Sequence, residues 1–246
     1  MDKLYMILLC LMIVPILICI KYSRKIKSDV ASSIVKCLIF TIVTILSNGL
    51  SAFSGNETFS YIMEALYRFS FDLMLIYVLQ YSQQYTRVFH EVSPFKKGCF
   101  IIAYLDGILL FLNIIFHNVF TIETVRFPNF DMYHVADKSI IFYFHYVFAY
   151  GLVFCIIASF IIKIIQIPDF YRKKYLPILV LMCVITVSKF ICGILEFPID
   201  VSLPFFVCAA ILICYMTLYR SPRELVDKTL SIVCLLYTSP SPRDGA

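Results

Sequence analysis

The chain has 246 residues, of which 61% are hydrophobic and only 15% are charged, and its formal net charge is +5. A soluble domain needs roughly a quarter of its residues charged to cover its surface, so this composition excludes a soluble globular protein. The basic residues lie in separate short loops and form no continuous stripe, so we expect no nucleic-acid partner. The composition indicates a protein whose main partner is the lipid bilayer.

Seven apolar blocks follow one another along the chain, each about as long as a helix that crosses roughly 30 Å of hydrocarbon. The blocks are Leu4–Ile20, Ile34–Phe53, Tyr61–Tyr81, Gly98–His117, Ile140–Ile165, Leu176–Leu195 and Ser202–Tyr219. The pattern predicts an all-α membrane protein, a bundle of seven transmembrane helices that forms one domain over residues 1–220.

Lysine and arginine are concentrated in alternate loops, which predicts the orientation of the bundle. The first, third and fifth connections and the C-terminal tail are rich in them: Lys21, Arg24, Lys25, Lys27, Arg87, Lys96, Lys97, Arg172, Lys173, Lys174, Arg220, Arg223 and Lys228. The N-terminal end and the other connections carry only Lys3, Arg126 and Lys138. Because positive loops stay in the cytoplasm, we expect the N-terminus outside and the C-terminus inside.

The connection Asn118–Ser139 is longer than the other loops and is predicted to lie outside. Apolar residues alternate in it on both sides of Pro128-Asn129. This alternation is typical of a small β-hairpin lying over the bundle. An irregular loop at the membrane interface explains the same composition, and the sequence favours neither.

The apolar blocks carry charged residues well away from the cytoplasmic loops, among them Glu64, Arg68, Asp72, Asp106 and Lys189. The first three are spaced i, i+4 and i+8, so they share one helix face. A charge at bilayer depth costs several kcal/mol unless it is paired or hydrated. One interpretation is a polar cavity that binds a small ligand or ion. The other is a structural network in which Glu64 and Asp72 neutralise Arg68 while Lys189 pairs with Asp106.

Motifs for catalysis or metal binding are missing from the sequence. It contains no phosphate-binding glycine loop, no nucleophile elbow and no zinc-binding helix motif. His145 is expected to form an inward hydrogen bond and not to bind metal, since no second His or Cys stands at ligand spacing. We therefore expect no catalytic residue, no metal and no cofactor, and the chain is predicted not to be an enzyme.

The segment after the seventh block begins a new helix. Ser221-Pro222-Arg223-Glu224 forms a capping box with Ser221 at the N-cap and Glu224 at N3, and apolar residues follow at helical spacing. Residues 221–233 are therefore expected to start a cytoplasmic signalling helix. Residues 234–246 lose this pattern and resemble a translated sequencing adapter, so we expect a non-native tail and a native gene that continues beyond Val233.

The seven blocks, the turn Asp200-Val201-Ser202-Leu203-Pro204 and the exit Leu218-Tyr219-Arg220 together resemble a known kind of sensor. They are similar to the N-terminal seven-transmembrane region of bacterial histidine kinases and GGDEF diguanylate cyclases, over about residues 4–233. The resemblance implies a multi-pass homodimer in the bacterial plasma membrane. It also implies an unidentified small ligand and a cytoplasmic output domain outside these 246 residues.

A small secondary transporter is the alternative function, with the intramembrane charges as an ion or substrate path. The chain shows no inverted repeat, and Pro15 is the only proline well inside an apolar block. Transporters of this kind are typically built from inverted repeats and paired broken helices, so these features argue against the alternative.

Overall fold

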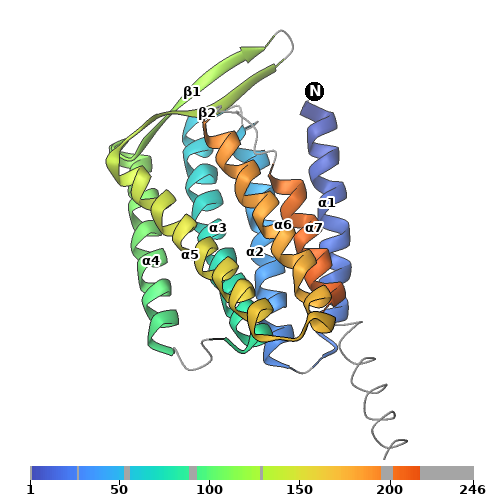
Figure 1. Ribbon diagram of the computed structural model, residues 1–246. Coiled ribbons are helices and arrows are strands. Elements are labelled where there is room, and N and C mark those ends of the chain that lie inside the picture. Colours follow the sequence, from blue (N-terminus) through green and yellow to red (C-terminus); the bar gives the residue numbers. More distant parts are fainter. Residues whose placement is uncertain are drawn as a thin grey trace, which may run out of the picture.

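The computed structural model describes residues 2–26, 28–52, 56–88, 93–127, 130–194 and 202–216. Within these ranges the chain forms helices that run in alternating directions through one bundle, and a two-stranded hairpin lies over one end of it (Figure 1). In chain order the elements are α1 (Asp2–Ser23), α2 (Asp29–Ala52), α3 (Glu57–Thr86), α4 (Ser93–Phe116), β1 (Phe120–Phe127), β2 (Phe130–Lys138), α5 (Ile140–Gln166), α6 (Asp169–Ile194) and α7 (Leu203–Tyr215).

Four of these helices have stretches long and apolar enough to cross a membrane, namely Asp29–Ala52, Pro94–Phe116, Ile140–Gln166 and Tyr175–Cys192. Their outer faces carry large exposed apolar side chains; Ile115 and Val147, for example, are 71% and 70% exposed. Such faces suit contact with lipid. The predicted all-α class is confirmed, apart from the hairpin, and the apolar helices fit a membrane protein.

Helix α3 is the longest described helix, with 30 residues, and it packs against α2, α4 and α5. Asn56 caps its N-terminus by accepting a hydrogen bond from the Phe59 amide. Small hydroxyl residues line its interface with α2, where Thr44 Oγ1 lies 3.0 Å from Ser70 Oγ and Ser60 Oγ donates to the Ser51 carbonyl. Small polar residues let two helices approach closely in an apolar environment. Helix α3 therefore occupies the interior, where its Glu64, Arg68 and Asp72 are buried.

The hairpin interpretation of Asn118–Ser139 is confirmed. Strands β1 and β2 pair antiparallel, with Ile122 opposite Val135 and an irregularity between Phe120 and Ile122. Phe120 and Ile122 are buried against the end of the bundle, where they pack with Tyr61. We call this the hairpin end of the bundle. The C-terminal ends of α1, α3 and α5 and the N-terminal ends of α2, α4 and α6 lie at the opposite end (Figure 1).

Helix α6 begins at Asp169, seven residues before the predicted apolar block, so Pro177 lies inside the helix. A proline nitrogen carries no hydrogen and cannot donate to the carbonyl of Lys173, four residues earlier.

Several predictions fall outside the described residues: the capping residues Ser221 and Glu224, the signalling helix 221–233, the tail 234–246 and most of the turn between α6 and α7.

Candidate functional site

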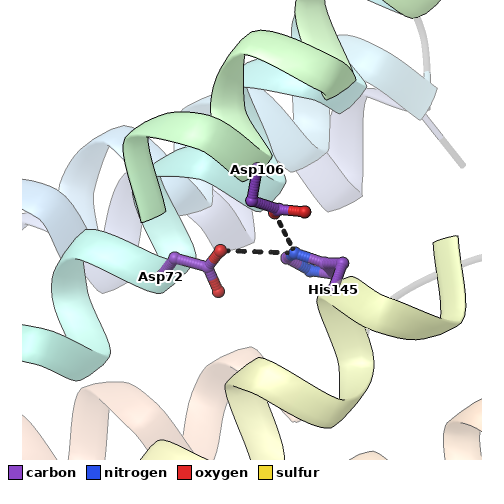
Figure 2. Close-up of side chains that lie close together, drawn as sticks. All are labelled: Asp72, Asp106 and His145. Carbon is purple, nitrogen blue, oxygen red and sulfur yellow. Dashed lines mark hydrogen bonds and ion pairs between the residues drawn. The ribbon is translucent and has the colours of Figure 1, made fainter. Parts of the chain in front are cut away.

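Three side chains from three helices meet inside the bundle (Figure 2). His145 of α5 places its Nδ1 atom 2.8 Å from Asp106 Oδ2 of α4 and 3.3 Å from Asp72 Oδ2 of α3. Asp72, Asp106 and His145 are 0%, 1% and 3% exposed. We call these three residues the Asp–Asp–His cluster. It gives His145 the inward hydrogen bond expected from the sequence.

The Asp–Asp–His cluster holds more acceptors than its single donor can serve. One Nδ1–H can point well at only one carboxylate, and the shorter distance favours Asp106. Neither carboxylate oxygen of Asp72 has a hydrogen-bond partner among the described residues. The 3.3 Å ion pair with His145 is then the contact that remains for this fully buried carboxylate, and Asp106 shares it, so the cluster needs a further explanation.

Arg68 lies one helical turn before Asp72 but pairs with Glu64. The guanidinium Nη2 is 2.5 Å from Glu64 Oε1, and Glu64 also accepts a hydrogen bond from Ser51. The guanidinium carbon lies 4.2 Å from the centre of the Phe142 ring, and the rings of Tyr67, Phe120 and Tyr146 lie within 5.9 Å of it. Cation–π contacts with these rings stabilise a charge that burial would otherwise destabilise.

Lys189 of α6 donates to the Tyr67 hydroxyl, and its ammonium group lies 5.0 Å from the centre of the Phe71 ring. Asp106, its expected partner in the structural network, is paired with His145 instead. The reason is the helix arrangement: α4 packs against α3, whereas α6 packs against α5 and α7. The i, i+4 pair of Glu64 and Arg68 is the part of that network that forms as predicted.

A narrow cavity runs along the inside of the bundle, between α3, α5, α6 and α7, with α2 at its side. Its polar residues gather towards the hairpin end, and apolar residues continue along α7 towards the opposite end. The cavity is lined among others by Tyr67, Arg68, His145, Tyr146, Lys189, Phe71, Met74, Val78, Ile156, Phe206, Ala210 and Ile213. Its volume is about 50 Å³. That is room for a few water molecules or one small apolar group, so a larger occupant requires the helices to move.

The sequence indicates that His145 faces the interior of the bundle, but it does not indicate which residues the histidine contacts. Phe142, His145, Ala149, Leu152 and Ile156 are all buried and recur at helical spacing along α5, which puts the histidine on the inner face. Its two aspartate partners come from other helices. No spacing within one segment could have indicated that contact.

Comparison with protein-family models and with curated proteins found no match for this chain.

Proposed function

We propose that the chain is the input module of a membrane sensor. It would pass a signal from the outer side of the bacterial plasma membrane to a cytoplasmic output domain, a histidine kinase or a diguanylate cyclase. One observation supports this best: the cavity joins the buried charged residues near the hairpin end to α7, the last described helix. A molecule bound among Tyr67, Arg68 and Lys189 would thereby affect the position of α7, the helix that is proposed to lead towards the output domain.

The proposal includes a full set of seven membrane crossings, with α1, α3 and α7 added to the four long apolar helices. The helix ends that border the connections rich in lysine and arginine lie together at the end opposite the hairpin (Figure 1). The positive-inside rule then favours a cytoplasmic position for that end and an external position for the hairpin. In this arrangement the Asp–Asp–His cluster and Arg68 lie in the outer half of the bundle.

The size of the cavity suggests how occupancy could be reported. A ligand larger than the narrow cavity fits only if the helices around it shift. On α7, Phe206 packs edge-on against Phe71 of α3, with ring centres 5.4 Å apart, and Ala209 and Ala210 also line the cavity. A ligand that separates these contacts binds one helix arrangement better than the other, and this difference is what signalling requires. We propose that a homodimer carries the shift to the output domain.

The site suggests a small, largely apolar ligand with one polar group. Phe71, Met74, Val78 and Ile213 offer it apolar contact, while Arg68 and Lys189 stand at the polar part of the lining. A chain of this kind performs no catalysis itself. The alternative, a small secondary transporter, would use the same charges as a path across the membrane.

Sequencing the native gene beyond Val233 tests the proposal, because an output domain should be encoded there. The output of the full-length protein is the second test.

Replacing Ala210 by Phe fills the cavity beside α7, so cyclic di-GMP production or kinase autophosphorylation should change several-fold. Val147→Phe is the matched control because Val147 is 70% exposed on the outer face of α5. Ala210→Val provides a smaller step if the phenylalanine prevents insertion into the membrane.

Two further variants, Asp72→Ala and Lys189→Ala, should alter output without loss of membrane insertion. Unchanged output in these two variants and in Ala210→Phe would leave the buried charges with a structural role only. A native stop codon directly after Val233 would favour the transporter.

A further inference from the structure

We infer that the Asp–Asp–His cluster is a binding site for a divalent transition-metal cation of the Zn²⁺ type, which would join α3, α4 and α5. This inference is independent of the sensor proposal, because a structural metal could equally serve a transporter. It also departs from the expectation, based on sequence spacing, that the chain has no metal site.

The donor atoms match such a cation in kind and spacing. Asp72, Asp106 and His145 each offer one ligand atom, and these atoms all lie within 4.8 Å of one another. Imidazole nitrogen together with carboxylate oxygen suits Zn²⁺ and its first-row neighbours, whereas Ca²⁺ and Mg²⁺ prefer oxygen alone. Three protein ligands leave one tetrahedral position for water.

The surroundings of Asp72 are a second observation. It is 0% exposed, and its carboxylate points towards His145 (Figure 2). Its ion-pair contact with His145 Nδ1 is 3.3 Å long and is shared with Asp106, and neither of its oxygens has a hydrogen-bond partner among the described residues. A cation placed between the two carboxylates would bind Asp72, Asp106 and the imidazole nitrogen together. One divalent charge then balances two carboxylates and a neutral imidazole, whereas a single shared proton leaves a net negative charge inside an apolar bundle.

The neighbouring cations do not replace the metal. Arg68, one turn away on α3, directs its guanidinium at Glu64 and at the Phe142 ring. Lys189 on α6 donates to Tyr67. Neither cation forms an ion pair with Asp72 or Asp106 in the described structure. His145 also lines the cavity, which provides a route by which a cation could reach the cluster.

Metal binding by the purified chain tests the inference. The full chain is extracted in detergent, treated with EDTA, exchanged into metal-free buffer and titrated with Zn²⁺ or Co²⁺ alone. We expect one tightly bound Zn²⁺ per chain by elemental analysis and a higher unfolding temperature with Zn²⁺. The Co²⁺ complex should show a d–d spectrum without a thiolate charge-transfer band, which separates this site from the cysteines.

Substitutions at the cluster give the decisive comparison. Asp72→Asn, Asp106→Asn and His145→Gln should each weaken Zn²⁺ binding at least about tenfold, since even outer-shell partners of a metal are worth roughly that much. Asp169→Asn and His134→Gln are the controls: they remove an exposed carboxylate and a hairpin imidazole outside the cluster. The two Asp→Asn changes keep side-chain shape, so the test survives if His145→Gln does not fold.

Two results would overturn the inference. One is a wild-type chain that binds no Zn²⁺ above the level of the three cluster variants. The other is Zn²⁺ binding that the control substitutions weaken as much as the cluster substitutions do.

Discussion

Among single residues, Asn113 shows how this chain satisfies backbone groups in an apolar interior. Its side chain is completely buried where α4 ends and β1 begins. Its Nδ2 donates to the Phe120 carbonyl, and its Oδ1 accepts from the amides of Val119 and Phe120. His117 ends the helix with a φ of 49°. One amide side chain thus supplies three hydrogen bonds that the turning backbone cannot make for itself.

Replacing Asn113 by Ala should lower the free energy of unfolding by about 2–4 kcal/mol, because three buried backbone groups lose their partner. Denaturant or thermal unfolding in detergent measures the change. Asn118→Ala is the matched control, since Asn118 is exposed, and it should change stability by no more than about 0.5 kcal/mol. Equal stability of the two variants would contradict this role of Asn113.

The residues of the site were predictable to different degrees. Glu64 and Arg68 lie one turn apart on the same helix, so the sequence alone predicts their ion pair, which the structure confirms. The contact of Asp72 and Asp106 with His145 depends on how α3, α4 and α5 pack. Three separate segments contribute one residue each, and only the packed bundle brings them together.

Among the elements, the α3–α4 interface depends on one glycine. A Cβ atom at Gly107 of α4 would lie 2.5 Å from Cδ2 of Phe69 on α3. The Phe69 ring is itself held between Tyr104 and Phe111, with ring centres 5.9 and 6.3 Å away. The missing side chain therefore lets the two helices approach closely.

Gly107→Ala should destabilise the chain by about 1–3 kcal/mol through overpacking, although alanine is the better helix former. The control is Gly151→Ala in α5, where a Cβ atom would meet nothing within 4 Å. That variant should be unchanged or more stable by up to about 1 kcal/mol. The difference in unfolding temperature between the two variants is the measurement, and its absence would show that Phe69 moves aside freely.

The sequence predicted the helices well but left the hairpin open. Long apolar blocks indicate helices directly. Helix α6 begins earlier than its apolar block, because Asp169 and the polar residues that follow it form the first turns of the helix. The alternation around Pro128-Asn129 fits a strand pair and an irregular loop equally. Burial of Phe120 and Ile122 against Tyr61 decides between them, and this contact is not visible in the local sequence.

At the scale of the whole molecule, the unequal distribution of basic loops predicts which end faces the cytoplasm. Alkaline phosphatase fused after Lys138 should be active in cells, since the hairpin end is proposed to be external. The same enzyme fused after Lys97 should be inactive, and green fluorescent protein fusions should give the reverse pattern. A reversed pattern at both positions would contradict the proposed orientation.

Which helices are neighbours was beyond the sequence. The expected contact of Lys189 with Asp106 required α6 to lie beside α4, but α6 lies beside α5 and α7. Six of the described helices have apolar stretches, so hydrophobicity alone does not select partners among them. In an apolar solvent, small residues and a few polar contacts make that choice.

The narrow cavity also gives the molecule a mechanical property. Empty space inside the bundle adds to the volume of the molecule, and this volume is recovered when the cavity collapses or fills. Hydrostatic pressure therefore favours whichever helix arrangement leaves less void. Pressure applied to the bundle should therefore shift α6 and α7 in the absence of any ligand. This shift would imitate or oppose the effect of the ligand.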